Sequence, residues 1–219
     1  MGRVNKFRVG ELFAGIGGIG IGLESTGAFE VVWQVEKDDY ATKVLKKHWA
    51  HVRRWDDVCT FPPAGQWEVD MITAGFPCTN ISNAGKMEGI KGNESKLFYE
   101  VIRIAEELRP KWLILENVTA LLHRGMGEVL RSLSAIGFDV EWFCVRASDL
   151  GAWHKRDRIF FMCQRADAEN DDVSYAFGER GRSWSSWCKN AANARQSSRR
   201  PQYREWSIEP ELGRVADGV

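Results

Sequence analysis

One cysteine stands where a nucleophile would have access to a ligand. Cys78 closes the segment Gly75-Phe76-Pro77-Cys78, which directly follows a predicted strand at residues 70–74. Ligands bind at the carboxyl ends of strands in open α/β sheets, and a thiolate is a strong nucleophile once its pKa is lowered or a base is near. Cys144 and Cys163 instead fall inside strand patterns, where we expect buried, small hydrophobic side chains. Cys78 is therefore the candidate nucleophile.

A carboxyl group and two guanidinium groups flank other predicted strands. Glu116 follows the apolar run 112–115, where partial burial favours the protonated form, able to donate to a ring nitrogen. The alternative is that Glu116 caps the next helix. Strand alternation places Arg156 and Arg158 on one side and Asp157 on the other. Two such guanidinium groups suit an anionic or carbonyl-bearing substrate, and the ordinary alternative is a pair of solvated surface arginines.

A glycine-rich turn follows the first predicted strand. Gly15-Ile16-Gly17-Gly18-Ile19-Gly20 matches the G-x-G-x-x-G template, whose glycines allow a tight turn and close approach of the backbone to a ligand. Glu36 ends the next predicted strand, where its carboxylate would accept hydrogen bonds from ribose hydroxyls. Together they indicate a cofactor that contains a nucleoside. The glycine template alone fits NAD, FAD or S-adenosylmethionine, and a glycine turn without a ligand is the simpler alternative.

The elements that must position these residues alternate as in a βαβ protein. Apolar runs predict strands at residues 8–13, 31–35, 70–74, 112–115, 138–145 and 158–163, and amphipathic stretches predict helices at 18–24, 38–48, 97–108 and 127–135. This order predicts an α/β fold with a Rossmann-like, mostly parallel sheet. Residues 166–219 have few aliphatic runs and many Ser, Asn and Arg residues, so we expect a domain boundary after Arg165 and a loop-rich segment beyond it.

The composition excludes several classes of protein. The 219 residues are 44% hydrophobic and 27% charged, which excludes a disordered chain, a collagen and a coiled coil. Lys+Arg and Asp+Glu both number 30, which excludes a uniformly basic nucleic-acid binder, although residues 180–204 hold seven basic side chains and no acidic one. No apolar run approaches the ~18 residues of a membrane span. With 5 cysteines and no CxxC pair, we expect no metal and no disulfide framework. Because the chain lacks a long apolar run, we also expect no membrane partner.

The order and spacing of the motifs resemble the C5-cytosine DNA methyltransferases. The likeness covers residues 8–165 and rests on these segments: Phe13-Ala14-Gly15-Ile16-Gly17-Gly18, Glu36, Gly75-Phe76-Pro77-Cys78, Glu116-Asn117-Val118 and Arg156-Asp157-Arg158. Under this resemblance, residues 1–165 form an S-adenosylmethionine-binding catalytic domain with the Rossmann-like fold of S-adenosylmethionine-dependent methyltransferases. Residues 166–219 then form a partial, loop-rich and poorly ordered target-recognition segment.

The resemblance implies a covalent mechanism and a set of contacts. Cys78 would attack carbon 6 of a flipped-out cytosine while protonated Glu116 interacts with ring nitrogen 3, and carbon 5 would then take a methyl group from S-adenosylmethionine. Arg158 and Arg156 would orient the base. The implied cofactor contacts are Phe13, Ala14, Gly15, Ile16, Gly17, Gly18, Glu36, Asp57, Val58 and Pro77. The implied DNA contacts are Ser82, Arg156, Arg158, Arg180 and Arg182.

The chain also departs from the family pattern. Thr79 replaces the Gln that usually follows the catalytic Cys, His154 replaces a Gln before the arginines, and nothing after Arg165 matches the closing elements of the family. We therefore expect a C-terminally truncated monomer that acts on double-stranded DNA, in the cytoplasm of a bacterial or phage-infected cell. It would work alone, pair with a complementary C-terminal polypeptide, or bind DNA or cofactor without turnover. The sequence leaves open a restriction-modification, phage or regulatory role, and an NAD-dependent oxidoreductase would give no role to Cys78 and Glu116 together.

Overall fold

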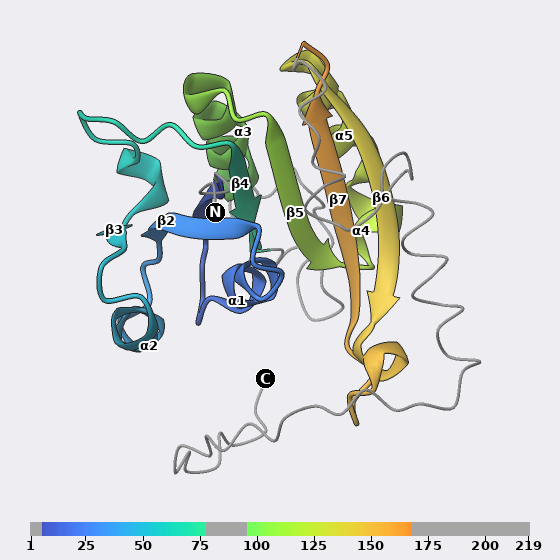
Figure 1. Ribbon diagram of the computed structural model, residues 1–219. Helices are drawn as coiled ribbons and strands as arrows, with labels where there is room; N and C mark the ends of the chain where they lie inside the picture. The colour runs from blue at the N-terminus through green and yellow to red at the C-terminus, as the bar shows by residue number, and fades with distance from the viewer. Residues whose placement is uncertain (1–5, 78–95, 168–219) are drawn as a thin grey trace. The chain divides into compact units, whose positions relative to one another are not determined.

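A seven-stranded sheet organises the part of the chain that the computed structural model describes, residues 6–77 and 96–167 (Figure 1). In spatial order the strands are β3 (Arg53–Trp55), β2 (Phe29–Val35), β1 (Phe7–Leu12), β4 (Met71–Ala74), β5 (Trp112–Val118), β7 (Asp157–Arg165) and β6 (Phe138–Arg146). The first five strands in this order run parallel, and β7 runs antiparallel to both β5 and β6. The mostly parallel α/β sheet is confirmed.

Helices follow the strands much as the periodicity predicts. They are α1 (Gly18–Glu24), α2 (Asp39–His48), α3 (Lys96–Leu108), α4 (Leu121–Arg124) and α5 (Met126–Ala135), with short 3-10 turns η1 (Val58–Thr60) and η4 (Ala147–Leu150). The central strands lie with both faces covered, and all four residues of β4 are buried. None of the helices within the described ranges combines the length and the apolar character that crossing a membrane requires.

The two outermost strands of the sheet, β3 and β6, differ most from the predictions. β3 has no aliphatic residue, so no apolar run announces it, yet it pairs with β2 through three residue pairs. At the other edge, β6 leaves most of its side chains partly or fully exposed. The prediction that Cys144 is buried is therefore wrong, because β6 has no further strand on its outer side in the described part of the chain. Cys163, on the enclosed β7, is buried as predicted, and burial raises the pKa of its thiol.

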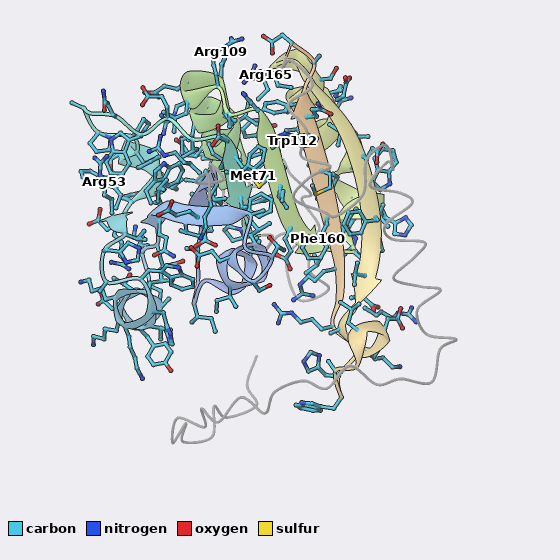
Figure 2. The ribbon with its side chains drawn as sticks, in the orientation of Figure 1. Arg53, Met71, Arg109, Trp112, Phe160 and Arg165 are labelled. Atoms are coloured by element: carbon cyan, nitrogen blue, oxygen red, sulfur yellow. The ribbon has the colours of Figure 1, made fainter. Side chains whose placement is uncertain are left out.

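A buried arginine closes the end of the sheet opposite the carboxyl ends of the parallel strands. Arg165, the last residue of β7, donates from its guanidinium to the carbonyl oxygens of Ala105 (3.1 Å), Ile136 (3.1 Å) and Pro110 (3.3 Å). Figure 2 shows Arg165 beside Arg109 at this end, away from Phe160 in the middle of β7. The guanidinium thus ties the last turns of α3 and α5 to β7.

Candidate functional site

Four parallel strands bring their carboxyl ends to one edge of the sheet. Leu12 of β1 pairs with Val35 of β2 and with Ala74 of β4, and Ala74 pairs with Leu115 of β5. The residues that come next along these strands are Phe13, Glu36, Gly75 and Glu116. Every one of them is a predicted site residue or part of a predicted motif, so the register gathers the motifs at a single edge, where open α/β sheets bind ligands.

The turn between β1 and α1 uses backbone conformations that favour glycine. Gly15 has a φ of +54° and Gly17 a φ of +86°. The Gly15 N–H donates to Oε2 of Glu36 over 2.7 Å, and Oε1 of Glu36 accepts from the Asp38 N–H over 2.8 Å. The structure therefore brings the glycine turn and the predicted ribose-binding carboxylate together, with both oxygens of that carboxylate oriented by the backbone.

The other predicted residues of this turn also lie at the edge. Phe13 is half-buried with a φ of +52°, an unusual conformation for a non-glycine residue that tends to occur at functional sites. The Ala14 N–H donates to the carbonyl oxygen of Val35 over 3.2 Å, which holds the turn against β2. Ile16 is exposed, and Gly18 begins α1. The turn is thus fixed at its base and open at its tip.

We expect the change Gly17→Ala to lower the free energy of unfolding by about 2–4 kcal/mol. A Cβ at residue 17 would lie 2.4 Å from the Trp49 ring in a left-handed conformation, and the Trp49 indole N–H is held by Glu24 over 2.9 Å. Gly18→Ala is the matched control, because a Cβ there meets nothing within 4 Å. Urea unfolding of both variants measures the difference, and equal losses would contradict the prediction.

A buried carboxylate beneath this turn anchors α1. Glu11 is buried on β1, and its two oxygens accept from the Gly20 N–H and from Nε2 of Gln34, each over 2.8 Å. Burial raises the pKa of Glu11. A Cβ at Gly20 would lie 2.7 Å from a Glu11 oxygen, so glycine is needed where the helix packs on the strand. The sequence analysis missed Glu11, because an acidic residue inside an apolar strand does not reveal its partners.

The implied cofactor contacts Asp57 and Val58 follow β3 at the same edge. Asp57 caps η1 by accepting from the Cys59 N–H over 2.9 Å, and this hydrogen bond lowers the pKa of Asp57. Lys37, next to Glu36, reaches to 3.9 Å from the Asp57 carboxylate. Val58 is buried. The ion pair therefore joins the segment after β2 to the segment after β3.

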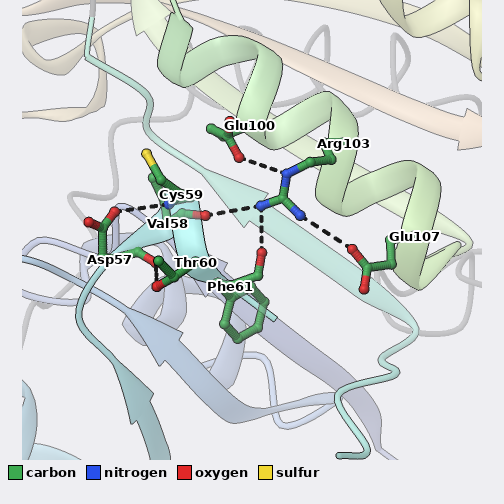
Figure 3. Close-up of polar contacts among 8 residues, drawn as sticks. All are labelled: Asp57, Val58, Cys59, Thr60, Phe61, Glu100, Arg103 and Glu107. Carbon is green, nitrogen blue, oxygen red and sulfur yellow. Dashed lines mark hydrogen bonds and ion pairs between the residues drawn. The ribbon is translucent and has the colours of Figure 1, made fainter. Parts of the chain in front are cut away.

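Arg103 of α3 holds this turn through two of its backbone carbonyl groups, as Figure 3 shows. Its Nη2 donates to the carbonyl oxygens of Val58 (3.2 Å) and Phe61 (2.5 Å). On the same helix, Glu100 and Glu107 contact the guanidinium over 2.7 and 3.3 Å and fix its direction. One side chain thus anchors η1 to α3. The sequence analysis missed Arg103, because an arginine on an amphipathic helix is usually a solvated charge.

We expect Arg103→Ala to lower the free energy of unfolding by about 1–3 kcal/mol, because two carbonyl oxygens lose their donor. Arg131→Ala is the control. Arg131 also forms an ion pair with a glutamate three residues earlier on its helix, Glu128, but on the exposed surface of α5. That change should cost less than about 1 kcal/mol. Urea unfolding compares the two, and an equal effect would show that the contacts to η1 contribute nothing.

On the other half of the edge, Glu116 of β5 meets Arg158 of β7. Arg158 Nε lies 2.7 Å from Glu116 Oε1, and the two side chains are 24% and 22% exposed. Gly75 adjoins the other oxygen, because a Cβ there would lie 3.4 Å from Glu116 Oε2. Capping by Glu116 does not occur, since the N-cap of α4 is Ala120. The ends of β4 and β5 and the start of β7 thus converge on one carboxyl group.

Arg156 and Arg158 are placed differently. Arg156 is exposed, with a φ of +30°, and lies one residue before β7, so strand alternation does not extend to it. Asp157 pairs with Arg146 over 2.8 Å. Arg158 is therefore the arginine that the structure brings into contact with Glu116.

The segment that leads to Cys78 is anchored by Asn117. The buried Asn117 amide donates to the carbonyl oxygen of Phe76 over 3.0 Å and accepts from the Val118 N–H over 2.8 Å. Pro77 is half-buried and is the last described residue before the gap. The predicted site residues Cys78, Ser82, Arg180 and Arg182, together with Thr79, lie outside the described residues. Asn117 thus holds the backbone two residues before Cys78.

The edge therefore has two chemical halves. The half formed by the glycine turn, Glu36 and the Asp57 turn offers oriented carboxylates and backbone groups that suit a nucleoside. The half formed by Gly75, Glu116 and Arg158 offers a carboxyl group and a guanidinium that suit a polar heterocycle. In residues 6–77 and 96–167, no three His, Cys, Asp or Glu side chains come together as metal ligands.

The chain is similar to known DNA methyltransferases. The family model described as C-5 cytosine-specific DNA methylase matches residues 7–209. The type II methyltransferase M.CviJI of Paramecium bursaria Chlorella virus IL3A is 41% identical over 170 residues, which cover 77% of this chain and 46% of that protein. The type II methyltransferase M.Sau3AI of Staphylococcus aureus is 33% identical over 186 residues, covering 75% and 45%. The chain thus spans about half the length of these relatives.

The fold is also that of solved methyltransferase structures. A prophage-encoded DNA modification methyltransferase of E. coli superposes with a TM-score of 0.61 at 24% identity, covering 77% of this chain and 50% of that chain. The likeness agrees with the predicted Rossmann-like methyltransferase fold.

Proposed function

The chain belongs to the C-5 cytosine-specific DNA methylase family, and from this membership we propose that it transfers a methyl group from S-adenosylmethionine to carbon 5 of cytosine in DNA. The observation that carries the proposal is the contact of Glu116 with both Arg158 and the Gly75 segment that leads to Cys78. These residues stand beside a nucleoside-binding half on the same sheet edge.

The residues of the nucleoside half fit S-adenosylmethionine. The left-handed Gly15 and Gly17 would let the backbone approach a ligand closely, and Glu36, held by the Gly15 N–H, would accept from ribose hydroxyls. Asp57 and Val58 would hold the adenine. The remaining contacts would come from Phe13, Ala14, Ile16, Gly18 and Pro77. When bound, this cofactor supplies an electrophilic methyl group.

The other half would activate the cytosine. Carbon 5 is a weak nucleophile, so the Cys78 thiolate adds to carbon 6, and electron density moves onto carbon 5 and the ring carbonyl. Oε1 of Glu116 is in the ion pair with Arg158, so Oε2 is the oxygen from which a protonated Glu116 would donate to ring nitrogen 3. Once carbon 5 carries the methyl group, it loses its proton to a base, and the bond to Cys78 breaks to restore the aromatic ring.

The proposed substrate is double-stranded DNA. Extrusion of the target cytosine from the stack costs a few kcal/mol, which contacts to the strand must offset. Arg156 and Arg158 would orient the base, and Ser82, Arg180 and Arg182 would contact the strand. We place the protein, a monomer, in the cytoplasm of a bacterial or phage-infected cell.

Because the chain spans about half of its relatives, a second candidate is binding of DNA or cofactor without turnover. In that case turnover would depend on a complementary polypeptide.

Transfer of a labelled methyl group tests the proposal. The chain is incubated with tritiated S-adenosylmethionine and mixed-sequence duplex DNA, alone and with the C-terminal part of a relative. Label should appear in 5-methylcytosine and should not appear when every cytosine of the duplex is already methylated at carbon 5. Label on adenine, or no label in either mixture, would overturn the proposal.

A further inference from the structure

An exposed tryptophan stands out on the connection between β6 and β7. Trp153 is 96% exposed, the largest fraction among the exposed large hydrophobic side chains of the described residues. A single exposed hydrophobic side chain is ordinary on a protein surface, but tryptophan is enriched at interfaces, so its neighbours decide what it suits. The question is which partner fits this site.

The connection, residues 147–156, presents Trp153 on an ordered backbone. Its two arms are joined where the Ala147 N–H donates to the carbonyl oxygen of Lys155 over 3.0 Å. The Ala152 N–H donates to the carbonyl oxygen of Ala147, also over 3.0 Å. The ion pair between Arg146 and Asp157 closes the base over 2.8 Å. Trp153 is therefore held out from the sheet by a closed turn.

The charge around Trp153 is mainly basic. His154, Lys155 and Arg156 follow it directly and are exposed, and the Trp153 and His154 rings contact at 5.3 Å between centroids. Asp149 is the acidic residue of the connection, and Asp157 is paired with Arg146. An aromatic ring next to exposed cations is the combination that binds exposed bases and phosphates.

The connection lies at the same edge as the candidate site. Arg158, which contacts Glu116, stands in register with Val118 at the end of β5. Figure 1 shows the connection extending beyond the ends of β5 and β6. Residues 153–156 thus directly precede the strand that carries Arg158 to Glu116.

We propose that residues 153–156 form a DNA-docking element in which Trp153 stacks on the base beside the vacated cytosine position and Lys155 contacts an adjacent phosphate, next to Arg156, which would orient the base. The inference rests on the proposed function, because that function supplies the unstacked base. Trp153 then stabilises the opened duplex, and the cations give a salt-dependent part of the affinity.

Fluorescence anisotropy with a labelled duplex that has an abasic site opposite guanine tests this element, with the fully paired duplex as reference. We expect Trp153→Ala to weaken binding of the abasic duplex by about 5- to 100-fold. Trp153→Phe should retain most of the affinity. Lys155→Ala should reduce the dependence on salt by about one phosphate contact. Trp142→Ala is the matched control, since Trp142 is 48% exposed on β6, and should bind as the unchanged protein does.

Several results would overturn the inference. They are an unchanged affinity of the Trp153→Ala variant, an equal loss in Trp142→Ala, or no DNA binding by the unchanged chain. A lower thermal midpoint of Trp153→Ala with unchanged DNA affinity would mean that Trp153 packs against protein instead. If binding depends on Trp153 but no methyl group is transferred, the proposed function fails and the docking element stands. If the unchanged chain transfers methyl groups and Trp153→Ala binds DNA with unchanged affinity, the proposed function stands and the docking element fails.

Discussion

Replacing Cys78 with alanine is expected to lower the rate of methyl transfer by at least about 1000-fold. Without the thiolate no bond forms at carbon 6, and carbon 5 keeps too little electron density to take the methyl group. The backbone that leads to residue 78 should stay in place, because Asn117 holds Phe76 and Gly75 lies against Glu116. Cofactor binding should therefore survive in the variant.

The measurement is transfer of tritium from S-adenosylmethionine to duplex DNA, together with calorimetric titration of the cofactor. Cys144→Ala is the matched control, since Cys144 is an exposed thiol on the outermost strand β6, and β7 lies between it and Glu116 of β5. It should transfer at the unchanged rate. If Cys78→Ala turned over like the unchanged chain, the covalent mechanism would be wrong.

The fold was predictable where patterns are local. The strands β1, β4 and β5 and the amphipathic α3 could be predicted, because the spacing of apolar residues that marks a buried strand or a half-buried helix lies within a single element. β3 did not, since Arg53–Trp55 is held by pairing with β2 rather than by its own hydrophobicity. The exposure of Cys144 depends on β6 being an edge strand, and strand order is a non-local property.

In the candidate site too, residues that follow a local pattern were predicted and residues that act through distant contacts were not. Glu36 and Glu116 were identified because each follows a strand, and parallel strands bring such positions to one edge. Arg103 was missed, and Asn117, although part of a quoted motif, was given no role, because their partners are backbone carbonyl oxygens of distant segments. No spacing in the sequence reveals such a contact. The pairing of Arg158 with Glu116 likewise depends on the antiparallel register of β5 and β7.

Replacing Glu116 with glutamine is expected to lower the rate of methyl transfer by about 100- to 1000-fold, with the fold intact. Glutamine keeps the shape of the side chain and can still accept from Arg158, but it carries no titratable proton for ring nitrogen 3. Charge that develops on the ring when Cys78 adds would then go unneutralised. Loss of the ion pair should cost no more than about 1 kcal/mol of stability, because both side chains are still partly solvated.

Comparing the turnover, cofactor binding and stability of Glu116→Gln distinguishes a catalytic role of Glu116 from a structural one. If Glu116 acts on the ring, Glu116→Gln should bind S-adenosylmethionine normally and lose turnover, because the nucleoside half of the edge does not use this residue. Glu128→Gln, which removes the carboxylate from the ion pair with Arg131 on α5, should change neither. Cofactor titration, urea unfolding and methyl transfer measured on the same preparations decide the matter. Turnover within about threefold of the unchanged chain would exclude Glu116 from the reaction, since even a modest acid contributes about 100-fold.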